Sequence, residues 1–335
     1  MQTERLNTSS DGIVRAAELL KSGGIVAVPT ETVYGLAADA ANEQAILKVF
    51  AAKGRPQDNP LIVHIAELSA LDRLTKEVPK AAYLLAECFW PGPLTMVLKR
   101  TDAVAPCVSA GLHTVAVRMP SHPIAQAIIR ASVPLAAPSA NTSGAPSPTE
   151  ADHVLHDLDG KIDAVVMADA CSVGVESTVV DLSVTPPRLL RPGGISAEQL
   201  REVLPDLVFD KAILQQPKEG ARVASPGMKY KHYAPKTQSF LVEGTTAQFA
   251  DYVNQKNDCA ALCFTEEDRA VTVPHLCYGS GASDEELARG LFAALRRVDG
   301  FGVSAIYIHA PRKTGVGLAV YNRLIRAAAF RVITL

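Results

Sequence analysis

Short apolar runs rich in β-branched residues recur along the chain, and they constrain its fold more than any other feature. The first run, Ile25 to Val28, opens after Gly23-Gly24 and stops at Pro29, as a buried strand does. Similar runs follow at 61–65, 94–98, 114–119, 134–137, 163–167, 178–182 and 188–191. Between them, apolar spacing and capping residues predict helices over 42–50, 79–90, 124–131 and 149–156. Because strands and helices alternate irregularly and the runs near 178–191 look like a hairpin, we expect an α/β domain with a mixed sheet over residues 9–205.

From residue 238 the alternation becomes regular. Strands are expected at 238–242, 259–264, 274–278 and 304–308, with helices near 246–255, 284–297 and 316–329. This pattern is typical of a smaller parallel, Rossmann-like domain with right-handed crossovers, which we place over 238–335. No GxGxxG sequence follows its first strand, so a dinucleotide site is not expected there. Residues 206–237 form a linker by position, although their Lys, Tyr and His are unusual for a passive linker.

Composition narrows the functional classes. A net charge of −2 gives no bulk basic field to attract nucleic acid. No apolar run reaches the ~20 residues of a membrane helix, and the first ten residues lack a signal-peptide core. The six cysteines are scattered through apolar segments, which favours reduced thiols and a cytoplasmic location. Cys259 and Cys263 form CxxxC, but no neighbouring His or Cys completes a metal motif, so no metal site is predicted.

Two polar motifs far apart in the chain predict an anionic site. Lys53-Gly54-Arg55 places two cations beside a turn, and Ser139-Ala140-Asn141 places a hydroxyl and an amide after an apolar run. Arg118 and Arg191 each close a further strand. Cations at the strand ends of one sheet can converge on a polyphosphate, which is what phosphoryl or nucleotidyl transfer requires. Taken singly, each motif has a structural alternative, namely charge at a helix C-terminus for the cations and a Ser or Asx turn for the loop.

The remaining candidates leave the nucleophile open. The segment from Pro29 to Leu36 could hold a small polar substrate with its hydroxyls and carboxylate, or could form a capped turn. His64 lies in an apolar strand, where a hydrogen-bonded core histidine is the commoner case. Ser139 lacks the GxSxG elbow, and the cysteines lack a paired histidine. These patterns favour direct attack of a bound substrate on a nucleotide, without a covalent enzyme intermediate.

In combination, the motifs resemble the YrdC/Sua5 family. PTETVYGL, KGRP followed by NPL and H, WPGPLT, VAVRMP, APSANTSG and STVVDL occur in that family's order, and the match covers the whole chain. The later SPGMKYKHYAPKT and the C-terminal unit resemble the two-domain Sua5 type of threonylcarbamoyl-AMP synthase. The resemblance implies a YrdC-like twisted mixed sheet around a central cavity, followed by a smaller Rossmann-like Sua5 C-terminal domain.

The resemblance also implies a reaction. L-Threonine, bicarbonate or CO2, and ATP would give threonylcarbamoyl-adenylate and pyrophosphate, with the carbamate attacking the α-phosphate and Mg2+ carried by the nucleotide. The product would pass to a downstream tRNA threonylcarbamoyl transferase complex that makes N6-threonylcarbamoyladenosine beside the anticodon. A weak contact with tRNA or double-stranded RNA is also implied, and no membrane partner is expected.

The family's functional residues map onto this sequence in three groups. The signature tetrad corresponds to Lys53, Arg55, Ser139 and Asn141. The threonine-side contacts resemble Thr32, His64, Arg118, Ala137 and Ser177. The ATP-side contacts resemble Arg55, Asn59, Thr114, Ser139, Ser147, Arg191 and Tyr233. Tyr233, with Lys229, Lys231 and His232, could close over the cavity mouth as a lid.

Three rival interpretations stay open from sequence. The larger domain could be a module that grips double-stranded RNA or tRNA through a basic concave face. It could serve another carbamoyl-adenylate enzyme, since related domains occur in hydrogenase-maturation carbamoyltransferases; those carry acylphosphatase and zinc-finger segments, which we do not find here. The C-terminal unit could regulate the enzyme or bind a protein partner rather than close the cavity.

Overall fold

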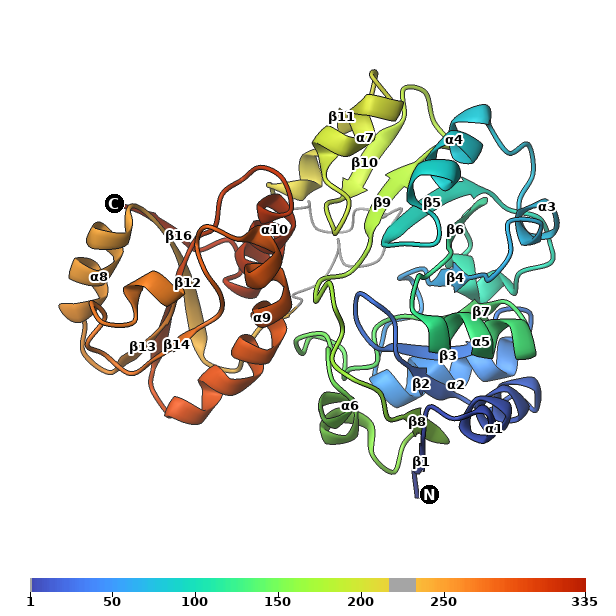
Figure 1. The fold of residues 1–335 in the computed structure, drawn as a ribbon, viewed down its shortest axis with the longest axis horizontal. Coiled ribbons are helices and arrows are strands. Elements are labelled where there is room, and N and C mark those ends of the chain that lie inside the picture. The colour runs from blue at the N-terminus through green and yellow to red at the C-terminus, as the bar shows by residue number, and fades with distance from the viewer. Residues whose placement is uncertain (1, 217–232) are drawn as a thin grey trace.

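The computed structural model describes residues 2–216 and 233–335, which form two sheets with their covering helices (Figure 1). Lys229, Lys231 and His232, predicted as lid residues, lie outside the described residues. An eleven-stranded sheet occupies the N-terminal part and a five-stranded sheet the C-terminal part. Within the described ranges, no helix is both long enough and apolar enough to cross a membrane.

The large sheet is mixed, as the irregular alternation predicts. In spatial order its strands are β1 (Glu4–Leu6), β8 (Ala164–Val166), β2 (Val26–Val28), β3 (Gly35–Asp39), β7 (Leu135–Ala136), β4 (Ile62–His64), β6 (Thr114–Arg118), β5 (Leu94–Lys99), β9 (Thr178–Asp181), β10 (Arg188–Arg191) and β11 (Val208–Phe209). Strands β9 and β10 pair antiparallel, which confirms the predicted hairpin-like pair.

Strand β3 is a finding of the structure. The polar residues after Pro29 predict a substrate-binding segment or a capped turn. In the structure the chain turns back there and β3 pairs antiparallel with β2, Val26 lying opposite Ala37. The turn places Thr30 and Thr32 at the end of β2, beside the strands that carry the other polar motifs. The hairpin therefore places Thr30 and Thr32 of this predicted segment close to the other polar motifs of the sheet.

Helices cover the large sheet at the predicted places, with several additions. They are α1 (Ser10–Lys21), α2 (Glu43–Lys53), α3 (Ala70–Leu74), α4 (Lys80–Phe89), α5 (Pro123–Ala131), α6 (Ala151–Leu158) and α7 (Ala197–Val203), with 3-10 turns η1 (Pro106–Ser109) and η2 (Lys211–Ile213). Asn42 caps α2 by accepting from the Ala45 amide at 3.1 Å. Helix α2 ends where Gly54 adopts the left-handed conformation (φ 61°), so Lys53 is its last residue and the helix runs beyond its predicted end at residue 50.

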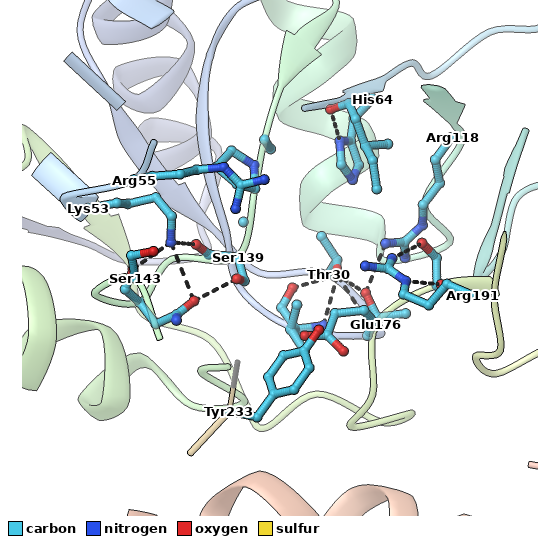
Figure 2. Close-up of a pocket in the computed structure, with 18 of the residues that line it drawn as sticks. Thr30, Lys53, Arg55, His64, Arg118, Ser139, Ser143, Glu176, Arg191 and Tyr233 are labelled. Carbon is cyan, nitrogen blue, oxygen red and sulfur yellow. Dashed lines mark hydrogen bonds between the residues drawn. The ribbon is translucent and has the colours of Figure 1, made fainter. Parts of the chain in front are cut away.

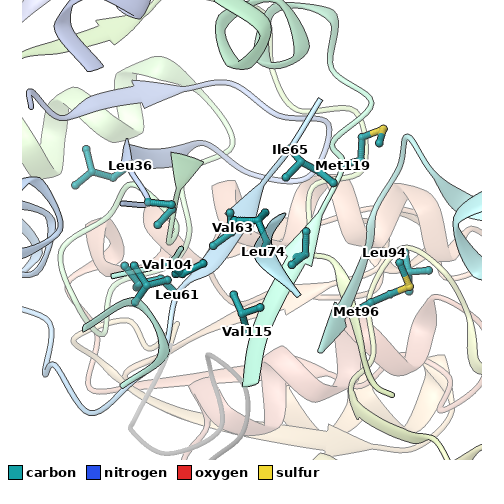
Figure 3. Close-up of a cluster of buried hydrophobic side chains, with 14 of the residues drawn as sticks. Leu36, Leu61, Val63, Ile65, Leu74, Leu94, Met96, Val104, Val115 and Met119 are labelled. Atoms are coloured by element: carbon teal, nitrogen blue, oxygen red, sulfur yellow. The ribbon is translucent and has the colours of Figure 1, made fainter. Parts of the chain in front are cut away.

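The core of the large domain lies between the sheet and its helices. Figure 3 shows apolar side chains from neighbouring strands, among them Val63, Val115 and Met96, in one cluster with Leu74 of α3 and Val104 of the segment after β5. Val63 and Val117 are register partners in β4 and β6, so alternate residues of both strands point to the same face. Burial of such side chains contributes roughly 1.5–3 kcal/mol each. That packing fixes the strand ends that carry the polar residues.

The C-terminal sheet is entirely parallel, as predicted. Its order is β14 (His275–Cys277), β13 (Cys259–Cys263), β15 (Ala305–His309), β12 (Gln238–Glu243) and β16 (Val332–Thr334). Strand β15 lies between β12 and β13, so the order differs from that of a dinucleotide-binding sheet. Its helices are α8 (Thr246–Asn254), α9 (Asp284–Arg297) and α10 (Gly317–Ala327), with 3-10 turns η3 (Thr265–Glu267) and η4 (Val298–Phe301).

Helices α9 and α10 join the two parts of the molecule. In Figure 1 they lie between the small sheet and the large domain, with α8 on the far side. Every residue of α10 is buried, including Arg323, which is fully inaccessible. A helix buried on all sides needs partners for its polar side chains. The large domain supplies Glu176 and the Pro192 backbone oxygen to Arg323, and Glu243 of β12 accepts from Tyr321.

Candidate active site

One cavity gathers most of the predicted polar residues (Figure 2). It has about 710 Å3 of empty space, including the part open to solvent, which is within the ~300–1,000 Å3 range of small-molecule sites. Lys53 and Arg55 approach from one side, and Arg118 and Arg191 from the other. The cavity is lined by Thr30, Thr32, Val33, Gly35, Lys53, Arg55, Ile62, His64, Arg118, Ala137, Pro138, Ser139, Asn141, Ser143, Gly144, Glu176, Ser177, Arg191 and Tyr233.

Lys53 holds the Ser139 loop in place. Its Nζ donates to the backbone oxygens of Ser139 and Asn141, both at 2.5 Å, and approaches Asn141 Oδ1 at 3.4 Å. Ser139 Oγ in turn donates to Asn141 Oδ1 at 2.5 Å. Burial and the charge of Arg55 lower the pKa of Lys53, whereas three oxygen acceptors match the three donors of an ammonium group. Lys53 is only 1% exposed, so it is a fixed, buried part of the cavity wall rather than a mobile surface cation.

Arg55 follows the helix end and enters the cavity above this loop (Figure 2). Its guanidinium donates to the backbone oxygen of Pro60 at 3.2 Å and of Asn59 at 3.4 Å. The Asn59 side chain is 1% exposed, and within the described residues its amide has no hydrogen-bond partner. These contacts fix the KGRP and NPL segments to each other.

Arg118 organises the opposite wall. It forms an ion pair with Glu31 at 2.6 Å and donates to Thr32 Oγ1 at 2.9 Å. Thr32 Oγ1 also lies 2.9 Å from Thr30 Oγ1. Burial raises the pKa of Glu31, but the charge and hydrogen bond of Arg118 outweigh it and hold the pKa below its ordinary value. The Thr30–Thr32 turn is thus fixed to the end of β6 by a buried ion pair.

Arg191 and Glu176 complete that wall. Arg191 donates from Nε to the Ser177 backbone oxygen at 3.1 Å and from its terminal nitrogen to Ser177 Oγ at 3.2 Å. Burial and the charge of Arg323 lower the pKa of Arg191 to about 10, so it stays cationic at neutral pH. Glu176 accepts from Ser147 Oγ at 2.5 Å. Burial raises the pKa of Glu176, but Arg323 and Arg191 hold it below its ordinary value.

His64 presents a neutral imidazole to the cavity. It is 6% exposed, and its Nδ1 lies 3.1 Å from the Ile62 backbone oxygen. Burial and the charge of Arg118 lower the pKa of His64 to about 3. With Nδ1 donating to that oxygen, Nε2 is left as an acceptor. A group with so low a pKa is a weak proton acceptor, which argues against His64 as the general base.

Tyr233 reaches the cavity from outside the large domain's strands. It is 5% exposed, adopts φ 63°, and packs against Phe292 of α9 with ring centroids 5.3 Å apart. Val33 and Val175 belong to the same apolar cluster. The next residue, Ala234, donates its amide to Gly144 at 3.1 Å. The C-terminal helices therefore hold Tyr233 against the Ser139 loop.

The structure brings the predicted site residues together with three exceptions. Asn59 and Ser147 lie behind the cavity wall, the latter fully buried against Glu176. Thr114 starts β6 opposite Lys99 and does not line the cavity, whereas Arg118 at the other end of that strand does. Each position is a finding about geometry, and the roles of these residues stay predictions.

Sequence reasoning missed two arginines on the C-terminal helices. Arg323 forms an ion pair with Glu176 at 2.9 Å and donates to the Pro192 backbone oxygen at 2.5 Å. Arg296 makes a bidentate pair with Asp157 at 2.9 and 3.0 Å. No motif surrounds either residue, and their partners lie far away in the sequence. Only their position on helices could have drawn attention to them.

Comparisons with known proteins identify the family. A family model described as "Telomere recombination" matches residues 18–193, and one described as "Threonylcarbamoyl-AMP synthase, C-terminal domain" matches residues 195–329. The chain is 46% identical over 330 residues to the threonylcarbamoyl-AMP synthase of Pyrococcus abyssi, covering 95% of this chain and 94% of that relative. The chain belongs to the Sua5/YrdC family. The enzyme of the same name from Bacillus subtilis is also 46% identical, over 338 aligned residues, covering 99% of this chain and 97% of that relative.

A solved Sua5 structure confirms the two-part architecture. Pyrococcus abyssi Sua5, complexed with L-threonine, matches with a TM-score of 0.90 and 40% identity, covering 100% of both chains. The family resemblance, the enzyme class and the fold predicted from sequence are thereby confirmed. The cavity described above is lined mainly by the YrdC-like part and by Tyr233, which packs on Phe292 of the Sua5 C-terminal part.

Proposed function

We propose that this chain makes threonylcarbamoyl-adenylate and pyrophosphate from L-threonine, bicarbonate or CO2, and ATP. The carrying observation is the placement of cations on two opposite sides of one cavity, with hydroxyls between them (Figure 2). Arg55 on one side and Arg191 on the other can neutralise an extended polyphosphate. Catalysis of nucleotidyl transfer rests mainly on such positioning and charge.

Threonine is proposed to bind at the Arg118 wall. The Pyrococcus abyssi Sua5 crystallised with L-threonine supports this substrate class. Arg118 and the hydroxyls of Thr32 and Ser177 suit a carboxylate and a side-chain hydroxyl. The Nε2 of His64 can accept from the amine or hydroxyl, and the backbone near Ala137 closes this side. His64 then orients threonine without removing its proton.

ATP is proposed to lie along the Ser139 loop. Arg55, Ser139 and Arg191 line that part of the cavity, and Tyr233 lies at its mouth. Ser147 would act through Glu176, and Asn59 through its backbone oxygen, which accepts from Arg55. Thr114 would need the nucleotide to extend beyond the cavity. Lys53 and Asn141 are proposed to hold the loop's shape, because their polar atoms already bond to it.

Mg2+ is proposed to arrive on the nucleotide phosphates. Mg2+ prefers oxygen ligands and is commonly held by one or two carboxylates together with substrate phosphates. Among the described residues lining the cavity, the carboxylate is Glu176, which is paired with Arg323 and accepts from Ser147. Because this carboxylate is already paired, most ligands of the metal would come from the nucleotide phosphates. When bound, Mg2+ would neutralise the negative charge that develops on those phosphates.

The chain's residues would then perform three tasks. They hold threonine so that its carbamate oxygen faces the α-phosphate, stabilise the negative charge that develops there, and exclude water from the labile carbamate. The carbamate oxygen bonds to the α-phosphorus and pyrophosphate leaves, so no enzyme nucleophile is needed. We propose that the adenylate is consumed by a tRNA threonylcarbamoyl transferase that modifies adenosine beside the anticodon.

The test is an assay of pyrophosphate release from ATP. We expect release to require both L-threonine and bicarbonate, and the threonylcarbamoyl-adenylate mass to appear in step. Arg55→Ala should lower kcat/KM by about 10²-fold or more, since a lost charge donor in such a site costs that much. Arg73→Ala is the matched control, because Arg73 lines a separate depression beside α3. Release independent of threonine, or equal rates in both variants, would contradict the proposal.

The same assay separates this function from an RNA-binding module. A module that only grips double-stranded RNA would bind it tightly and consume no ATP with threonine. We expect RNA to leave the rate of adenylate formation unchanged. Tight RNA binding without threonine-dependent turnover would favour the rival function.

A further inference from the structure

Two cysteines and a histidine meet on the C-terminal sheet, away from the cavity residues. Strands β13 and β14 pair in parallel, with Cys263 directly opposite Cys277 and Ala261 opposite His275. His275 and Cys277 are two residues apart on a strand, so they share a face. In the sequence, Cys263 forms a CxxxC pattern with Cys259, from which no metal site is predicted. The sheet instead gives Cys263 two partners from β14, contrary to the expectation that no His or Cys lies near it.

The distances in this cluster suit a metal better than a disulfide. The two sulfur atoms lie 3.7 Å apart, and the ligand atoms of Cys263, His275 and Cys277 all lie within 4.8 Å of one another. Two thiolates on a tetrahedral zinc, each about 2.3 Å from the ion, would be separated by about 3.8 Å. A disulfide needs about 2.05 Å. The two thiols therefore already have the spacing of neighbouring zinc ligands.

His275 is oriented as a metal ligand. Its Nδ1 lies 2.8 Å from the backbone oxygen of Val273, so donation there leaves Nε2 as the acceptor atom. Histidines that bind metals almost always donate their other ring nitrogen to a carbonyl or carboxylate, which fixes the ring. In this structure the Val273 backbone oxygen already makes that contact with the second ring nitrogen of His275.

Asp268 lies on the His275 and Cys277 side of the cluster, outside the three ligand atoms that meet within 4.8 Å, so its side chain would turn towards the ion to become a fourth ligand. Its Oδ1 lies 3.3 Å from His275 Nε2 and 3.5 Å from Cys277 Sγ. The preceding Glu267 is fully buried, pairs with His309 at 2.6 Å and accepts from the Phe264 amide at 2.8 Å. This buried support fixes the turn that follows β13, and so holds the backbone of Asp268 beside the cluster.

We propose that Cys263, His275 and Cys277, with Asp268 as the fourth ligand, bind one zinc ion. Two thiolates and an imidazole select a borderline-soft ion such as zinc over Mg2+ or Ca2+. The site joins β13 to β14, the edge strand of the small sheet, so its role is structural.

Metal stoichiometry on the full chain tests this proposal. Reduced protein is loaded with equimolar Zn2+, freed of excess by gel filtration, and measured by native mass spectrometry and elemental analysis. We expect one zinc per chain, falling to less than a tenth in Cys277→Ser and His275→Gln. Cys88→Ser is the control, since Cys88 is an exposed cysteine on α4. Circular dichroism confirms that each variant folds.

A second probe reports the ligands directly. Co2+ in place of zinc should give the visible bands of a tetrahedral site and a sulfur-to-cobalt charge-transfer band, and the latter should weaken in Cys277→Ser. Zinc should also raise the melting temperature of the wild-type chain and leave that of Cys277→Ser unchanged. Failure of the reduced wild-type chain to retain zinc would overturn the proposal. A Cys263–Cys277 disulfide in a chain that takes up no metal when reduced would also overturn it. The same holds if Cys277→Ser retains as much zinc as the wild-type chain.

Discussion

Individual side chains in the cavity hold one another before they hold any substrate. Lys53 bonds to the Ser139 loop, Arg118 to Glu31 and Thr32, and Arg191 to Ser177. Such preorganisation lowers the cost of orienting charges during the reaction. It also means that a substitution can remove activity by altering the wall rather than by removing a substrate contact. Stability and activity must therefore be measured together.

Lys53→Met should destabilise the fold as well as abolish activity. The substitution keeps the chain length but leaves the backbone oxygens of Ser139 and Asn141 without their donor, and each unmet buried acceptor costs about 1–3 kcal/mol. We expect the unfolding free energy in urea to fall by roughly 3 kcal/mol. Lys48→Met on the same helix removes one donor to Gly23 and should cost less. An inactive Lys53→Met chain of wild-type stability would instead assign Lys53 to direct phosphate binding.

His64 should make stability depend on pH. Its pKa is about 3 in the folded chain against about 6.5 unfolded, so between these values the unfolded chain binds the extra proton. Stability is then fully present above pH 6.5 and is lost as pH falls towards 3, at about 1.4 kcal/mol per unit.

Urea unfolding at pH 7 and pH 5 measures this contribution. The wild-type chain should lose about 2 kcal/mol more than His64→Gln over that interval, because glutamine does not titrate. Comparing the two chains cancels the carboxylates that titrate in both. An equal loss in the two would show that His64 is protonated in the folded chain at pH 5.

The residues of the cavity could be predicted from sequence far better than their partners could. KGRP, SANTSG and the arginines closing strands are short motifs of polar residues beside apolar runs, and the sheet brings them to one place. The partners of Lys53 are backbone oxygens, which carry no sequence signal. The low pKa of His64 depends on burial and on Arg118, which becomes its neighbour only when β4 and β6 pair.

At the scale of elements, helix α10 anchors the active-site wall from the other part of the molecule. Its Arg323 pairs with Glu176, next to Ser177, and two neighbouring side chains bond to the η2 segment, Asn322 to Ile213 and Arg326 to Ala212. Helix α9 makes a second tie, through Arg296 to Asp157. Asp157 also accepts from the Thr142 amide in the Ser139 loop. Both walls of the cavity are therefore tied to the C-terminal helices.

Arg323→Met should weaken both folding and catalysis. Removing one partner of a buried ion pair leaves the other charge uncompensated, which costs about 3–5 kcal/mol. We expect a melting temperature several degrees lower and a reduced kcat/KM. Arg312→Met is the control, because Arg312 pairs with Asp284 at an exposed site. Arg323→Met combined with Glu176→Gln should recover part of the stability; if it does not, the ion pair is not the source of the loss.

Elements with a strong hydrophobic period were predictable, and those defined by pairing were not. Helices α2, α4 and α9 begin or end at capping residues or prolines visible in the sequence. Strand β3 has Gly35 and three alanines or leucines in place of β-branched residues, and it forms because β2 and β7 flank it. The position of β15 between β12 and β13 likewise depends on long-range pairing.

At the scale of the whole molecule, one apolar cluster spans both parts. Val33 and Val175 of the large domain pack with Tyr233 and with the buried face of α9, which includes Leu291 and Phe292. Gly174 lies so close to α9 that a Cβ there would meet the backbone of Ala288 and Arg289. A shared core of this kind argues that the two parts move little relative to each other at this contact.

A chain ending at residue 205 should therefore lose activity and stability together. Truncation exposes Val33 and Val175, removes Tyr233 from the cavity mouth, and leaves Glu176 without Arg323. We expect kcat/KM at least tenfold below that of the full chain, measured by pyrophosphate release, and a lower melting temperature.

Tyr233→Ala in the full chain tests the tyrosine at the cavity mouth separately from the Arg323–Glu176 ion pair. The substitution keeps that ion pair but opens the cavity to solvent. With the newly formed adenylate exposed to water, part of it should hydrolyse to AMP, so we expect pyrophosphate release to exceed the adenylate recovered. Tyr233→Phe keeps the ring on Phe292 and should keep the two amounts equal. A truncated chain that matches the full chain in rate and in coupling would show that the large domain needs neither the anchor nor the tyrosine.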